Sequence, residues 1–262
     1  MKLFFYNHPY HLVTLSPWPL LTSLSIFISM IGSLNMFMLN QYKLMFTGIM
    51  LILLCSYQWW RDIVRESTFQ GLHTKNIYNL LKMGMFLFII SEILFFISFF
   101  WSYFHSSLSP NIDIGALWPP KNIEQFNPYE IPLFNTIILL SSGISITYSH
   151  YMILMNKMNK SLMSLKLTIM LGILFTMIQF YEYLMSSFCM SDSIFGSLFF
   201  MTTGFHGLHV IIGSLFLFIT LIRMNNNQLS SFHHYGFESA SWYWHFVDII
   251  WIIVYSMIYW WN

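Results

Sequence analysis

The sequence predicts an all-α polytopic membrane protein with seven transmembrane helices. Charged residues make up only 8% of the 262 residues and hydrophobic residues make up 56%, whereas about a quarter of the positions in an ordinary soluble domain carry charge. Apolar runs long enough to cross a bilayer of about 30 Å recur along the chain. Lys and Arg are also divided unevenly between alternate connections, as is typical of polytopic membrane proteins.

Seven apolar runs are candidates for transmembrane helices, because about 20 residues at about 1.5 Å each cross the hydrocarbon. We place the helices at about 18–39, 44–66, 80–104, 131–155, 162–185, 194–222 and 241–261. The second starts with the shortest apolar run and is expected to continue as a polar helix to Glu66. The proline-rich connection 105–130 is expected to form an ordered cap. We expect residues 1–262 to form a single transmembrane domain.

The basic residues predict the orientation of these helices. Two of them, Lys43 and Lys121, fall on one side of the membrane, and the other nine fall on the amino-terminal side. Those nine are Lys2, Arg61, Arg65, Lys75, Lys82, Lys157, Lys160, Lys166 and Arg223. Because connections on the inner side carry the excess of Lys and Arg, the amino terminus is expected inside and the carboxyl terminus outside.

The composition also indicates where the chain is made. The sequence contains only two alanines, Ala116 and Ala240, but 27 Phe, 19 Met and 15 Tyr. These are residues of A/T-rich codons, and so many methionines are easier to obtain where ATA also encodes Met. We therefore expect a mitochondrially encoded protein of the inner membrane. A net charge of +1 offers no basic surface for nucleic acid, which excludes that class of partner.

Glu92 is the only carboxylate predicted near the middle of a transmembrane helix. Ionisable groups inside a bilayer are costly and are usually paired or functional. The apolar neighbours in FIISEILFF favour the neutral carboxyl, which leaves two interpretations open: a hydrogen bond that joins two helices, or a role in handling protons or contacting lipid. Glu182 lies almost at the outer end of its helix, where we expect water to be near.

Four further polar residues are predicted to form a structural network. His206 and His209, and likewise His245 and Asp248, are three residues apart and share a helix face. Imidazoles in this pattern can begin a haem or metal site. However, Gly204, Gly207 and Gly213 around the first pair favour close helix packing. His233–Glu238 are expected to form a loop, and we expect no metal site in the chain.

A third group lies at the polar end of the second helix. Aromatic rings and cations at headgroup depth favour contact with phospholipid, although an ordinary positively charged helix end is equally consistent with them. The residues of this group are Trp59, Trp60, Arg61, Arg65, Glu66 and His73.

Several long segments resemble cytochrome c oxidase subunit III of mitochondria, from about His8 to Trp261. They are WWRDIVREST, GMFLFIISEILFFISFFWSYFHSSLSP, NTIILLSSGISITYSH, FFMTTGFHGLHVIIGS and HHYGFESASWYWHFVDIIWIIVYSMIYWW. The resemblance implies two bundles, the first two helices and the last five, around a V-shaped cleft filled with lipid. It also implies a core subunit of complex IV of the respiratory chain, which transfers electrons from cytochrome c to oxygen and pumps protons.

The resemblance further implies which partners and residues are involved. Subunit I is the expected main contact, with subunit II, small accessory subunits and respiratory supercomplex partners beyond it. Haem a, haem a3, CuA and CuB are expected in those partners, and this chain is expected to bind no redox centre and to have no catalytic residue. It is expected to stabilise the core, to support oxygen access and proton uptake, and to bind phosphatidylglycerol or phosphatidylethanolamine and cardiolipin.

The family's intramembrane carboxylate corresponds to Glu92. Its headgroup contacts correspond to Trp59, Arg65, Glu66 and His73, with Arg223 near another anionic lipid. Many relatives carry further basic residues after Arg223, where this chain reads MNNNQ. The alternatives from other classes are a stand-alone proton-coupled transporter, against which the lack of internal repeats counts, and a membrane oxidase that binds haem itself.

Overall fold

The computed structural model describes residues 10–11, 13–112 and 115–261, and the part of the chain that it describes is all helical. The seven predicted helices are present. Among the described residues, six helices are long and apolar enough to cross a membrane, and α2 (Lys43–Thr68) is the exception. Lys2, which contributes to the predicted orientation, lies outside the described residues.

The chain divides into two compact units, residues Met1–Leu81 and Lys82–Asn262. The first unit is built on the hairpin of α1 (Trp18–Leu39) and α2. Asn40 ends α1 in the left-handed conformation, with φ 54°. Gly32 and Gly48 allow the two backbones to approach closely, since a β-carbon on Gly48 would lie 2.6 Å from the backbone nitrogen of Ser29. Small residues at such contacts are typical of helices that pack within a membrane.

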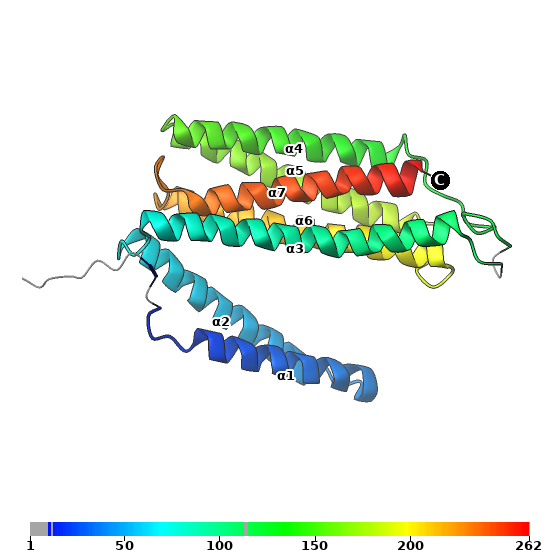
Figure 1. The fold of residues 1–262 in the computed structure, drawn as a ribbon, viewed down its shortest axis with the longest axis horizontal. Coiled ribbons are helices and arrows are strands. Elements are labelled where there is room, and N and C mark those ends of the chain that lie inside the picture. Colours follow the sequence, from blue (N-terminus) through cyan, green and yellow to red (C-terminus); the bar gives the residue numbers. More distant parts are fainter. Residues whose placement is uncertain (1–9, 12, 113–114, 262) are drawn as a thin grey trace, which may run out of the picture. The chain divides into compact units, whose positions relative to one another are not determined.

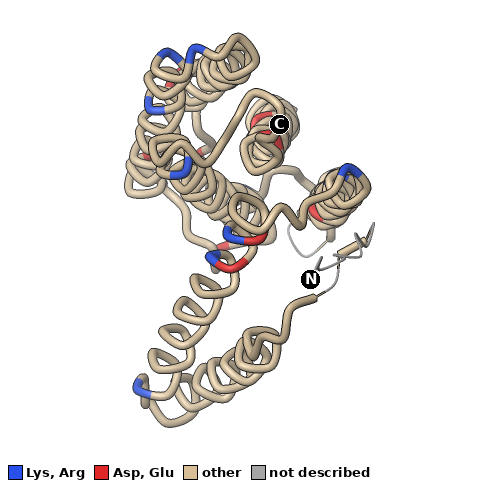
Figure 2. The backbone as a smooth tube through the Cα atoms, turned by 90° about the vertical axis from the view of Figure 1, so that its left-hand side faces the viewer, with Lys and Arg blue, Asp and Glu red and all other residues tan. Residues whose placement is uncertain are grey.

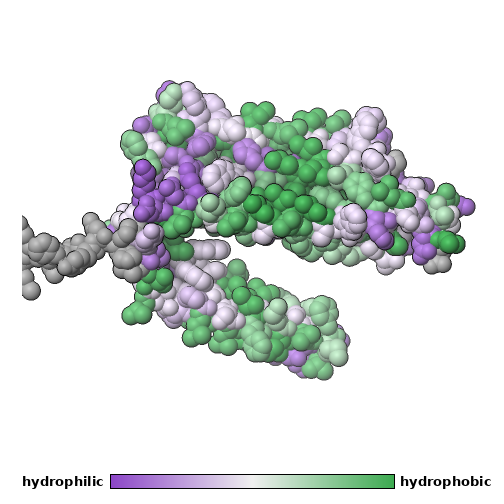
Figure 3. Space-filling model, viewed as in Figure 1, coloured by the Kyte–Doolittle hydropathy of each residue, from purple (hydrophilic) through white to green (hydrophobic). Residues whose placement is uncertain are grey.

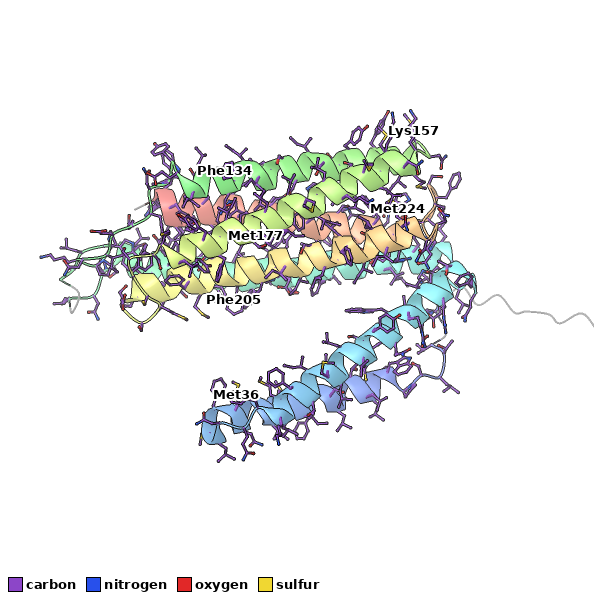
Figure 4. All side chains as sticks on the ribbon, turned by 180° about the vertical axis from the view of Figure 1, so that it is seen from behind. Met36, Phe134, Lys157, Met177, Phe205 and Met224 are labelled. Carbon is purple, nitrogen blue, oxygen red and sulfur yellow. The ribbon has the colours of Figure 1, made fainter. Side chains whose placement is uncertain are left out.

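The second unit contains α3 (Lys75–Leu108) from Lys82 onward, α4 (Ile131–Leu154), α5 (Met158–Leu184), α6 (Ile194–Asn225) and α7 (Tyr235–Val254). These helices lie side by side and alternate in direction (Figure 1). Lys157 and Met224 therefore lie at one end of this unit and Phe134 at the other (Figure 4).

The indole of Trp244 joins four of these helices. It is fully buried, and its Nε1 donates a hydrogen bond of 2.9 Å to the hydroxyl of Ser142 on α4. A β-carbon on Gly172 of α5 would lie 2.6 Å from the indole, and one on Gly213 of α6 would lie 3.0 Å from it. The two glycines therefore form the slot that holds the ring of α7.

A row of buried hydroxyl groups connects α4 to α5. Ser149 and Ser161 lie 2.8 Å apart between their oxygens, and Ser145 lies 2.7 Å from Thr168. Ser164 also donates to the carbonyl oxygen of Ser145. Because these side chains are short, the two helices pack closely while their polar groups are satisfied inside the protein.

The last helix begins earlier than the sequence indicates. Tyr235–Glu238 form the first turn of α7 rather than a loop, because the backbone nitrogens of Phe237 and Glu238 both donate to the carbonyl oxygen of His234. Phe237 is fully buried, so packing holds this turn in place. The carboxylate of Glu238 also suits the positive end of the helix dipole. At its other end α7 continues as a π-helix, η2, over Tyr255–Trp260.

Much of the apolar surface of the chain is exposed. Only 11% of the most apolar window of α1, and 11% of that of α3, is buried within the chain. Hydrophobic residues cover the middle of the second unit, with hydrophilic residues toward its ends (Figure 3). This distribution matches a protein whose outer surface contacts hydrocarbon or other membrane subunits.

We predict that Gly172→Ala lowers the stability of the folded chain by about 1–3 kcal/mol, because the new methyl group would force Trp244 out of its slot. Gly207→Ala is the matched control, since a β-carbon there meets no described atom within 4 Å. The melting temperatures of the two variants in mild detergent test this. Equal melting of both variants would show that the slot contributes nothing.

Candidate functional site

Glu92 of α3 is hydrogen bonded to His209 of α6. Its Oε2 lies 2.9 Å from Nε2 of the imidazole, and Nδ1 of the imidazole lies 2.7 Å from the carbonyl oxygen of Phe205. The rings of Phe96 and Tyr243 pack against the imidazole. The carboxylate side chain is 24% exposed and the imidazole 12%, so the pair lies at the edge of the helical unit and not at its centre.

The geometry of this pair indicates how many protons the two side chains share. A carbonyl oxygen only accepts hydrogen bonds, so Nδ1 of His209 carries a proton. The short contact between Nε2 and Oε2 then needs one further proton between the two groups. The pair is either a neutral carboxyl with a neutral imidazole or a carboxylate with an imidazolium, and its net charge is zero in both forms. A net neutral pair is what an apolar environment tolerates.

The other three residues of the predicted network make separate contacts. His206 is 1% exposed, and its Nε2 lies 3.2 Å from the carbonyl oxygen of Val247. His245 lies 3.9 Å from Asp248, whose carboxylate occupies the space above Gly143, where a β-carbon would lie 2.9 Å from Oδ2. Thus His206 is bonded to a carbonyl and His209 to a carboxylate, whereas His245 lies near a carboxylate without a hydrogen bond to it.

The glycines of α6 do not all serve close packing. A β-carbon on Gly213 would contact Trp244, but one on Gly204 or Gly207 would meet no described atom within 4 Å. The expectation that all three bring helices together is therefore correct for Gly213 and wrong within this chain for the other two.

The expectation that water lies near Glu182 is wrong. This carboxyl is fully buried, and Tyr259 of the π-helical segment donates a hydrogen bond of 2.6 Å to it. Asn135 of α4 donates to Gln179 of α5 nearby, at 3.2 Å. The sequence does contain a signal, since Gln179 and Glu182 are three residues apart and so lie on one face of their helix. The partner of Glu182 comes from η2 and could not be read from α5 alone.

The charged end of α2 is organised around Asp62. Its carboxylate accepts hydrogen bonds from the Trp18 indole at 2.7 Å and from the Arg61 guanidinium at 3.0 Å. Arg65 lies 3.9 Å from the same carboxylate and is 56% exposed. Arg61 is therefore committed to a partner within the unit, whereas Arg65 extends toward the surroundings.

The remaining members of this group differ in exposure. Glu66 is 8% exposed, and it accepts a hydrogen bond of 3.1 Å from Thr14 and lies 3.8 Å from His11. It therefore ties the segment before α1 to α2. Trp59 and Trp60 are 37% and 59% exposed. His73 lies in the connection from α2 to α3 and is half-buried.

Arg223 lies in the last turn of α6. Its guanidinium lies against Gly236 of α7, where a β-carbon would collide with Nη1. It is therefore held partly inside the helical unit. His233 follows in the connection to α7, where burial, together with the nearby His234 and Arg223 side chains, lowers its pKa. Within the described ranges, one group brings three metal-ligating atoms together: His150, His234 and Glu238.

Comparison with known proteins identifies the family to which this chain belongs. The family model described as "Cytochrome c oxidase subunit III" matches residues 8–262. The chain belongs to the cytochrome c oxidase subunit III family. It is 54% identical to cytochrome c oxidase subunit 3 of Rhipicephalus sanguineus, over 97% of this chain and 99% of the relative. It is 51% identical to that of Drosophila melanogaster, over 98% of both chains.

A third relative, cytochrome c oxidase subunit 3 of Heterololigo bleekeri, is 52% identical over 98% of this chain and 99% of its own length. Membership of the subunit III family makes this chain a subunit of the terminal oxidase, in a complex with other oxidase subunits. The stand-alone transporter is not supported. The multi-pass architecture of the described helices agrees with an inner-membrane protein.

We predict that Glu92 and His209 are energetically coupled. In a double-mutant cycle of Glu92→Leu and His209→Leu, the double variant should be about 1 kcal/mol more stable than the sum of the single effects predicts, which is a typical size for a hydrogen bond between membrane helices. Glu92→Gln should keep most of the stability, because its amide can donate to Nε2. Melting of the purified oxidase is measured for the wild type and the four variants, and strictly additive losses in the cycle would contradict the pairing.

Proposed function

We propose that this chain is a non-catalytic, lipid-binding subunit of the proton-translocating cytochrome c oxidase of the mitochondrial inner membrane. Its partners, with subunit I as the main contact and subunit II and small accessory subunits beside it, pass electrons from cytochrome c to oxygen and hold haem a, haem a3, CuA and CuB. The segregation of Lys and Arg supports an amino terminus in the matrix and a carboxyl terminus in the intermembrane space.

The observation that carries the lipid role is the exposed guanidinium of Arg65. Both neighbouring carboxylates are engaged, Asp62 by Trp18 and Arg61, and Glu66 by Thr14. Arg65 lies 3.9 Å from Asp62 and is 56% exposed, so its guanidinium can also reach a phosphodiester, and an arginine fork matches phosphate geometry well. The exposed ring of Trp60 lies at the same helix end, where aromatic side chains contact lipid at headgroup depth.

In this proposal the residues of the helix end have different roles. Arg65 binds the headgroup, with Trp59, Trp60 and His73 beside it. Arg61 and Glu66 act indirectly, because their contacts hold the helix end in shape. Arg223 is proposed as a second contact for an anionic lipid such as cardiolipin.

Glu92 is proposed to stabilise the subunit and to help sustain proton uptake by subunit I. Its bond to His209 supports a stabilising role directly. Because the pair already contains a proton between its two groups, a transfer within it would not change the net charge. The surface of α3 offers oxygen an apolar environment. Only 11% of the most apolar stretch of this helix is buried within the chain, so most of its apolar side chains face outward.

We predict that Arg65→Ala removes about one tightly bound anionic phospholipid from the purified oxidase. The reason is the loss of the more exposed of the two arginine side chains described at that helix end, 56% for Arg65 against 36% for Arg61. Lys43→Ala, at the opposite end of the same helix, is the matched control and should keep the lipid. Phospholipid analysis of complexes purified in mild detergent provides the measurement. Equal lipid content in both variants would refute the headgroup role of Arg65.

We also predict that the redox centres stay with the partners when this chain is removed. Dissociating it from the detergent-solubilised oxidase should leave the full haem spectrum in the remaining complex, which should lose activity faster during turnover. Haem that travels with this chain would contradict the non-catalytic assignment. It would make His206, His209 and His245 the first candidate ligands.

A further inference from the structure

A cluster of metal-ligating side chains lies at the end of the second unit where α7 begins. It comprises His150 near the end of α4, His234 directly before α7, and Glu238 in the first turn of α7. One ligand atom from each lies within 4.8 Å of the other two. His234 is 4% exposed and the other two are half-buried. Figure 2 looks onto the end of the unit at which this cluster lies.

The distances in this cluster match a tetrahedral metal ion. Nε2 of His150 lies 3.3 Å from Nε2 of His234, and Nε2 of His234 lies 3.5 Å from Oε1 of Glu238. In a tetrahedral zinc site with bonds of about 2.0–2.1 Å, neighbouring ligand atoms are about 3.3–3.4 Å apart. Two pairs of ligand atoms in this chain therefore already have nearly the separation that such an ion requires.

The surrounding contacts orient the ligand atoms. Nδ1 of His234 lies 3.1 Å from the carbonyl oxygen of Ser230, so it donates its proton there and the neutral imidazole presents a lone pair at Nε2. Lys82 binds the other carboxylate oxygen of Glu238, Oε2, at 2.8 Å and leaves Oε1 directed toward the histidines. Contacts of this kind commonly fix metal-ligating histidines and carboxylates.

We propose that His150, His234 and Glu238 form a binding site for a divalent metal ion of the zinc class. Two imidazole nitrogens and one carboxylate oxygen suit zinc better than calcium or magnesium, which prefer oxygen ligands. Three protein ligands leave a fourth position for water. The ion would connect α4 to the start of α7 and would displace the proton between the two imidazoles. The charge of Lys82 opposes the ion, which favours reversible binding.

The test is zinc uptake by the intact oxidase after a chelator has removed exchangeable metal. Zinc ions alone are added back by equilibrium dialysis, and the bound metal is measured. The wild-type complex should bind one zinc more than a complex with His234→Ala, His150→Gln or Glu238→Gln. Each of these changes should weaken that site at least tenfold, since the loss of even an indirect contact typically costs 10–100-fold in metal affinity.

His233→Ala is the matched control, because this histidine is adjacent in sequence to His234 but outside the cluster. It should leave zinc uptake unchanged. Equal uptake by the wild-type and His234→Ala complexes, or an equal loss in His233→Ala, would overturn the proposal. If a variant fails to assemble, the X-ray absorption spectrum of zinc on the wild-type complex decides. Two imidazoles and one carboxylate support the site, and a shell without imidazole overturns it.

Discussion

The second helical unit depends on how the indole of Trp244 is held. The ring is fully buried among α4, α5 and α6, with Gly172 and Gly213 making the space and Ser142 accepting its one hydrogen bond. In a bilayer, apolar burial hardly favours one helix neighbour over lipid, so close packing and internal hydrogen bonds must choose the arrangement. A large rigid ring that fits a slot on two helices and bonds to a third provides both.

The same constraint explains the buried polar groups elsewhere. Hydrocarbon offers no hydrogen-bond partner, so a polar side chain there needs a bond to another helix or to its own backbone. Ser149 and Ser161 do this between α4 and α5, Tyr259 and Glu182 between the end of α7 and α5, and His209 and Glu92 between α6 and α3. Each contact is specific to one pair of helices, which makes these bonds a means of fixing which helices are neighbours.

The polar residues at the helix ends serve different purposes in the two units. In the first unit, Asp62 and Glu66 are bound by residues before and within the start of α1, which leaves Arg65 exposed to the surroundings. In the second unit, Lys82, His150, His234 and Glu238 bind one another across three helices. We therefore propose a phosphate contact in the first unit and a metal contact in the second.

The sequence alone determined the helical class and the approximate spans, because these depend on local composition, and the family, through long motifs such as FFMTTGFHGLHVIIGS. It could not determine partners that lie far apart in the chain. His209 is 117 residues from Glu92, and His150 is 84 residues from His234. Helical periodicity indicates which residues share one face of a helix, but not which other helix packs against that face. Only tertiary packing could bury Glu182 beneath Tyr259, begin α7 at Tyr235 and bring the ligands of the proposed metal site together.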